Sequence, residues 1–145
     1  MELFRPLRGR YVWSVRVGEG ALLTMELGNP RLEVAEVRHD GIPHRAVRPR
    51  GQWQLSLGEC AFELQVGDLV VDESSEVDAL ERAAERLDGQ ALLFAEERDG
   101  VLRLELDLGA VLTVTPLGEG VAWVLASEDA LYGWSDGSVV RLTPS

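Results

Sequence analysis

Apolar and polar residues alternate along most of the chain, in short runs separated by turns that contain glycine. In the clearest run, residues 60–66, every second side chain is apolar. A period of two places those side chains on one face of a strand, and closely spaced glycine turns favour antiparallel sheet. We therefore predict strands over residues 11–17, 21–27, 31–37, 53–57, 60–66, 69–71, 90–97, 101–107, 110–115, 121–126, 130–134 and 138–142.

The period changes once, over residues 75–88, where Val77, Leu80, Ala84 and Leu87 recur at intervals of three and four. This spacing is typical of the apolar stripe of an amphipathic helix. Residues 38–52 contain two prolines and several charged or turn-prone clusters, which favours a loop or an irregular arm. We predict a mainly β (α+β) fold whose antiparallel sheets form a partly closed barrel or a sandwich, with one central helix.

The chain also contains an internal sequence repeat. Leu7-Arg8-Gly9 precedes one predicted strand pair, and Leu87-Asp88-Gly89 precedes another at an offset of 80 residues. The turn at Gly20 returns at Gly100 with the same offset. We predict a single domain, 1–145, built of two related β-meanders at about 7–71 and 87–142, joined by the helix at about 75–88.

The charge is unevenly distributed. The chain of 145 residues carries a net charge of −11. Residues 1–52 have nine arginines against six acids, a balance of +3, and residues 53–145 have five against 19, a balance of −14. A chain this acidic is repelled by phosphate groups, so we expect no nucleic-acid partner and no membrane partner.

Targeting signals and cysteine usage favour the cytoplasm. The apolar run 91–95 is far too short to span a bilayer, and the first residues lack the pattern of a secretory signal. Cys60 is the only cysteine, so it has no partner for an internal disulfide, which fits a reducing compartment.

One segment resembles a known kind of domain. The resemblance covers residues 87–126 and is carried by Leu87-x-Gly89, Asp99-Gly100, Leu102-x-Leu104-x-Leu106, Gly109, Leu112-x-Val114 and Ala122-Trp123. It is to a small bacterial domain of unknown function that often occurs beside polymorphic toxin and contact-dependent competition loci. The resemblance implies a genomic setting and assigns no functional residue.

Three patterns suggest catalysis, and each has a better explanation. Gly133-Trp134-Ser135-Asp136-Gly137 matches Gly-x-Ser-x-Gly, but no histidine follows it, so a hairpin turn is favoured over a hydrolase. Cys60 alternates with apolar residues, which indicates a buried thiol. His39 and His44 lie among arginines without a third ligand, so we predict no metal site, no cofactor and no enzyme activity.

The candidate functional residues are therefore those of a binding surface. Acids on the polar side of the predicted helix, acids near the Asp99-Gly100 turn and two aromatics near the last turn are candidates for partner binding. These residues are Glu76, Asp78, Glu81, Glu85, Glu96, Glu97, Tyr132 and Trp134, of which we expect the two aromatics to be exposed.

These observations favour a non-enzymatic protein-binding factor. We predict an immunity-type or accessory protein that engages a basic toxin or effector through its acidic second half. The alternatives are a small-molecule-binding or sensor domain and a structural homo-oligomeric module whose edge strands pair between subunits.

Overall fold

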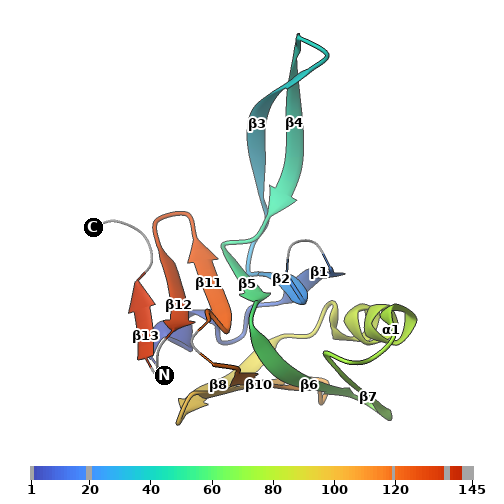
Figure 1. The fold of residues 1–145 in the computed structure, drawn as a ribbon, viewed down its shortest axis with the longest axis vertical. Coiled ribbons are helices and arrows are strands. Elements are labelled where there is room, and N and C mark those ends of the chain that lie inside the picture. Colours follow the sequence, from blue (N-terminus) through green and yellow to red (C-terminus); the bar gives the residue numbers. More distant parts are fainter. Residues whose placement is uncertain (1, 19–20, 119, 136–137, 142–145) are drawn as a thin grey trace.

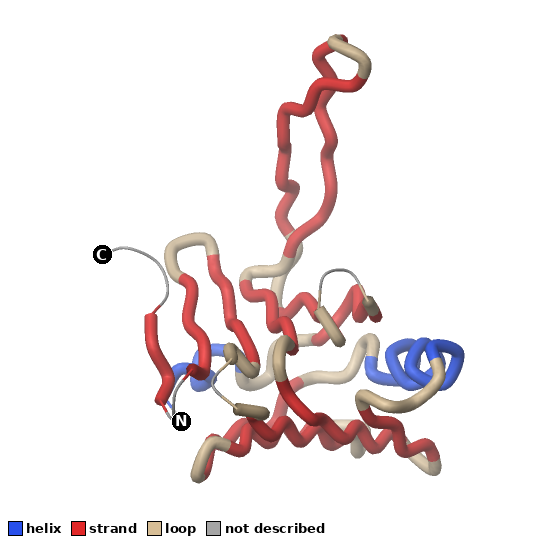
Figure 2. Tube along the Cα trace, in the orientation of Figure 1, coloured by secondary structure: helices blue, strands red, loops and turns tan. Residues whose placement is uncertain are grey.

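The strands form two antiparallel sheets and one separate hairpin (Figures 1 and 2). The computed structural model describes residues 2–18, 21–118, 120–135 and 138–141. The six-stranded sheet has the order β1 (Val12–Val17), β2 (Leu23–Leu27), β5 (Trp53–Leu57), β11 (Trp123–Ser127), β12 (Leu131–Ser135) and β13 (Ser138–Arg141). The five-stranded sheet has the order β7 (Leu69–Asp72), β6 (Cys60–Val66), β10 (Val111–Pro116), β9 (Val101–Leu106) and β8 (Leu92–Arg98).

The predicted fold class is confirmed: the chain is mainly β, with antiparallel sheets and one α-helix among the described residues. Neither sheet closes into a barrel. The helix, α1 (Val77–Leu87), buries Leu80, Ala83, Ala84 and Leu87 and packs against β1, β6 and β7. A short 3₁₀ helix, η1 (Glu2–Leu7), buries Phe4 and Leu7. No helix in the described part of the chain is long and apolar enough to cross a membrane.

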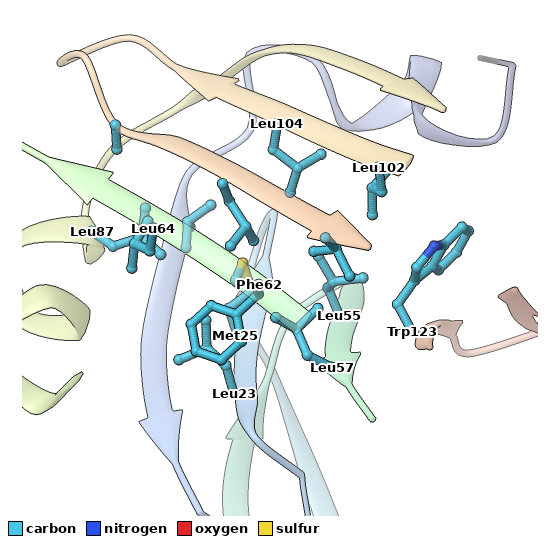
Figure 3. Packing of buried hydrophobic residues seen from close by; sticks show 14 of the residues in the cluster. Leu23, Met25, Leu55, Leu57, Phe62, Leu64, Leu87, Leu102, Leu104 and Trp123 are labelled. Atoms are coloured by element: carbon cyan, nitrogen blue, oxygen red, sulfur yellow. The ribbon is translucent and has the colours of Figure 1, made fainter. Parts of the chain in front are cut away.

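The alternating positions of the two sheets meet in one core (Figure 3). Met25 and Leu55 from the six-stranded sheet lie near Phe62 and Leu104 from the five-stranded sheet. Trp123 is fully buried and its ring packs at 5.6 Å from the ring of Phe4. Burial of this continuous apolar surface is the main force that holds the sheets together.

A sharp corner connects the two sheets. After β5 the chain crosses to the five-stranded sheet at Gly58, and after β10 it returns to the six-stranded sheet next to the same residue. The Gly58 N–H donates to the Ala122 carbonyl at 2.8 Å, and the Glu59 N–H donates to the Val121 carbonyl at 2.9 Å. The pairing of β5 with β11 therefore continues through the corner toward that of β6 with β10.

The two halves of the chain are interleaved. The meander β1–β2–β5 is extended by the strands β11–β12–β13 of the second half, and the meander β8–β9–β10 is extended by the hairpin β6–β7 of the first half. The Gly9 N–H donates to the Leu92 carbonyl and the Gly89 N–H donates to the Val12 carbonyl, both at 2.7 Å. These two bonds are related by a shift of 80 residues. Descent of the halves from one duplicated unit stays a prediction.

The third strand of the first meander differs from the predicted one. Residues 31–37 were expected to occupy that place, but β5 does, because it pairs with β2 along its whole length. The expected strand belongs to β3 (Arg31–His39), which pairs only with β4 (Ile42–Arg50). The prediction of a loop or an irregular arm at 38–52 is thus wrong for β4, which is a regular strand. Its prolines, Pro43 and Pro49, are tolerated because a two-stranded ribbon leaves alternate N–H groups without a strand partner.

Candidate functional site

The hairpin β3–β4, called the arm below, projects away from both sheets (Figures 1 and 2). Its strands pair continuously from Arg31 opposite Arg50 to His39 opposite Ile42. The tip is a two-residue turn, Asp40-Gly41, with both φ angles positive, at 52° and 79°. Asp-Gly between alternating strands is a strong hairpin signal, and this is the signal that the sequence analysis missed.

The arm exposes apolar side chains on both of its faces. Directly opposed residues of an antiparallel pair share a face, so Val34 and Val47 lie together, next to the pair formed by Leu32 and Pro49. Leu32 is 71% exposed, Val34 57% and Val47 55%. Near the tip, Ile42 is 67% exposed. No other described strand or helix packs along these residues.

The charge of the arm is opposite to that of the rest of the chain. Residues 31–50 contain five arginines and three acids, a net charge of +2, which leaves −13 for the other residues. Arg45 faces Glu36 across the strands at 3.4 Å, and Arg48 faces Glu33 at 3.8 Å. Exposed ion pairs of this kind contribute little to stability, so these arginines are available to a partner.

A buried carboxylate anchors the base of the arm. Glu26 in β2 has a fully buried side chain. Its Oε2 atom accepts hydrogen bonds from Arg16 at 2.7 Å and from Gln54 at 2.8 Å, and its Oε1 atom accepts the Gly51 N–H at 3.0 Å. Arg50, the last residue of β4, lies 3.7 Å from the same carboxylate.

These contacts keep Glu26 ionised. Burial by itself raises the pKa of the carboxyl group, but the hydrogen bonds from Gly51, Gln54 and Arg16 outweigh it, so the pKa lies below its usual value. Hydrogen-bond donors surround the carboxylate on several sides, and these bonds fix the chain at the point where the arm leaves the sheet. The sequence analysis missed Glu26, because a glutamate that alternates with the apolar residues of a strand gives no local sign of burial.

Two open grooves follow the arm. One of about 520 Å³ lies near the tip, between Glu36, Arg38 and Arg45. Another of about 590 Å³ lies at the base, where Arg48 and Arg50 face Gln54 of the sheet. Both have mixed polar and apolar walls, which is typical of surfaces that receive protein side chains.

The acids predicted for partner binding fall on two separate elements. Glu76, Asp78, Glu81 and Glu85 are all exposed along α1, as the sequence pattern predicted. Glu96 and Glu97 are half-buried on β8, which lies at the opposite edge of the five-stranded sheet from β7, where α1 packs.

The second acidic group has local roles. Glu96 pairs with Arg98 at 2.7 Å, and Glu97 accepts the Gly100 N–H at 3.0 Å, which supports the turn between β8 and β9. The structure therefore leaves the helix as the exposed acidic surface of the predicted set.

The aromatic residues near the chain end are not an exposed pair. Trp134 is only 8% exposed, which corrects the prediction, and Tyr132 is half-buried. The indole of Trp134 lies over Gly100, where a Cβ atom would come within 3.1 Å of the ring. Trp134 is buried because the inner face of β12 packs on the β8–β9 turn of the other sheet.

The candidate catalytic groups do not come together. Cys60 is 2% exposed, and burial, with a smaller contribution from Glu73, raises the pKa of its thiol to about 11. His39 and His44 lie on the arm, which leads away from the sheet that holds Cys60 (Figure 1). In the described residues, no group of three or more His, Cys, Asp or Glu side chains has the arrangement of a metal site.

The Gly-x-Ser-x-Gly segment lies where two strands pair. Ser135 at the end of β12 is opposite Ser138 at the start of β13, in an antiparallel hairpin. This matches the predicted hairpin, although Asp136 and Gly137 themselves lie outside the described residues.

Comparisons of the chain with protein-family models, with curated proteins and with solved structures find no match.

Proposed function

We propose that this chain is a non-enzymatic protein-binding factor and that the arm is the element that contacts the partner. The observation that carries the proposal is the exposure of Leu32, Val34 and Val47 on a hairpin that no other described element covers. Exposed apolar residues that lie together mark interaction surfaces, and arginine is enriched at such surfaces.

The anchoring of the arm supports the same function. An isolated two-stranded hairpin is marginally stable in water, so an arm of this length has a cost that a function must explain. The bonds of Glu26 to Arg16, Gln54 and Gly51 hold its base at one position on the sheet. A surface held in place in advance loses less entropy when it binds.

The acidic face of α1 supports a second candidate partner, a basic toxin or effector. Its carboxylates are exposed, and the resemblance of residues 87–126 implies a setting beside toxin genes. Reversing Glu76, Glu81 and Glu85 to arginine would then slow association with such a protein, and added salt would do the same. Tight binding that neither the three substitutions nor added salt weakens would exclude the acidic face of α1 as the binding surface.

The arm is tested by site-specific photocrosslinking in the cells that naturally produce the protein. A benzophenone amino acid replaces Val34 or, as the control, Leu108, which is 76% exposed on the turn after β9. We expect protein adducts from position 34, identified by mass spectrometry, and few from position 108. Equal yields at the two positions, or no protein adduct at position 34, would overturn the proposal.

A small-molecule-binding function predicts a different result. The described core residues pack into one cluster between the sheets, and the grooves along the arm are open. A ligand for such a domain would protect the Cys60 thiol or the tryptophans of the core from chemical modification. It would leave the crosslinking yield at position 34 unchanged. This outcome would favour the sensor interpretation over the protein-binding one.

A further inference from the structure

We propose that the arm binds the acidic face of α1 on a second copy of this chain. The inference rests on the proposed function and names its partner. It follows from two surfaces of the same molecule that have complementary charge and exposed apolar residues, but lie on elements that do not pack against each other in one copy.

The receiving surface is the segment 68–88, called the α1 patch below, which contains β7 and α1. It contains eight acids and two arginines, a net charge of −6. All of these acids except Asp72 are exposed. Val70 and Val77 are 56% and 59% exposed within the same segment. The patch therefore offers apolar contact surrounded by negative charge.

The arm offers the matching surface. Val34 and Val47 form an apolar centre, and Arg38 and Arg45 lie farther toward the tip with exposed side chains. Nine strand residues span roughly 30 Å, about twice the length of the 11-residue helix. The arm is thus long enough to cover the α1 patch of a neighbour.

The arm does not reach the α1 patch of its own copy. Its strands leave the six-stranded sheet beyond Pro30 and Gly51 and point away from the helix (Figure 1). The anchor at Glu26 fixes this direction. The positively charged arm of one copy is then attracted to the negatively charged α1 patch of another copy. If each copy receives the arm of the other, the contact is made twice and the assembly closes as a two-fold dimer.

The first test is the oligomeric state of the full chain by sedimentation velocity, from about 1 to 200 µM and at low and high salt. We expect a dimer whose dissociation constant rises at least about tenfold between 50 and 500 mM salt, because the steering charges are exposed. A chain that stays monomeric throughout would overturn the inference. The proposed function would still hold if position 34 crosslinks to a different protein.

The second test uses two variants with opposite charges. Arg38→Glu/Arg45→Glu changes the net charge of the arm from +2 to −2, so that it is acidic like the α1 patch. Glu76→Arg/Asp78→Arg/Glu81→Arg/Glu85→Arg changes the net charge of the α1 patch from −6 to +2, so that it is basic like the arm. Each variant alone should be monomeric, since like charges now face each other. An equimolar mixture should form a heterodimer, because both of its contacts again join opposite charges.

The matched control for the arm variant is Arg98→Glu/Arg103→Glu, which changes the net charge by the same −4 at exposed arginines of β8 and β9, outside both surfaces. This variant should dimerise like the natural chain. Circular dichroism establishes that each variant is folded. Variants that dimerise alone, or a mixture that stays monomeric while the natural chain dimerises, would overturn the arm-to-helix contact.

Discussion

Glu26 connects the stability of the protein to the position of the arm. Its carboxylate is fully buried, and it holds Arg16 and the backbone at Gly51 in place. Removing one partner from a buried ionic cluster leaves the other charges without compensation, which costs more than the cluster contributes in total. A side chain outside the apolar core thus determines where the arm leaves the sheet.

Glu26→Gln should lower the free energy of unfolding by about 3 kcal/mol at neutral pH, because Arg16 and Arg50 lose their buried counter-charge. Since the pKa of Glu26 is lowered in the folded state, its stabilisation is present above the unfolded value of 4.5 and is lost as the pH falls through the lower folded value. Urea titrations between pH 7 and pH 3 measure both effects. Glu33→Gln, at a partly exposed carboxylate, is the control and should cost well under about 1 kcal/mol.

Cys60 is a structural residue of the core. Cys60→Ala should lower the free energy of unfolding by about 1 kcal/mol, since it leaves only a small cavity. An alkylating reagent should modify the native thiol roughly a hundredfold more slowly than the unfolded chain, because the thiol is buried and its raised pKa keeps it protonated. Native labelling at the rate of the unfolded chain would contradict this.

At the scale of the elements, the corner between the sheets depends on one glycine. A Cβ atom at Gly58 would lie 2.6 Å from the Val121 carbonyl oxygen, so any larger residue must push the two bent strands apart. The bonds from Gly58 to Ala122 and from Glu59 to Val121 would weaken together.

Gly58→Ala should therefore lower the free energy of unfolding by about 2 kcal/mol, in the range typical of overpacking. Gly18→Ala is the control, because a Cβ atom there meets nothing within 4 Å and only the positive φ of 78° opposes it. Thermal unfolding compares the two variants. An equal loss in both would mean that close packing at the corner is not what requires Gly58.

At the scale of the whole molecule, the interleaving of the halves makes them dependent on each other. The six-stranded sheet combines three strands from each half, and the five-stranded sheet combines a three-stranded meander of the second half with a two-stranded hairpin of the first. Neither half can cover its own apolar face, and the core includes residues from both. Cooperativity should therefore extend over the whole chain apart from the arm.

Fragments 1–74 and 75–145, divided in the exposed turn before α1, test this dependence. Each fragment alone should lack a cooperative unfolding transition, and an equimolar mixture should regain the circular dichroism spectrum and the transition of the intact chain. The reason is that β5–β11 and β6–β10 pair only between the fragments. A fragment that unfolds cooperatively by itself would show that its half is an independent unit.

The sequence by itself determined the local structure of this protein. The period of two predicted the buried face of strands such as Cys60–Val66, and the single change of period predicted α1. These features depend only on the spacing of apolar side chains along one element. For the same reason the burial of Cys60 and the exposure of the helix acids were predicted correctly.

Only the tertiary structure decided which strands pair and which surfaces are covered. The pattern of β3 predicted an ordinary strand of the sheet, yet β3 forms a free arm with β4, because β5 takes the place beside β2. Glu26 is buried by the base of the arm, and Trp134 is buried by a turn of the opposite sheet. Burial of these residues depends on elements distant in sequence, and a local pattern contains no information about which element will arrive there.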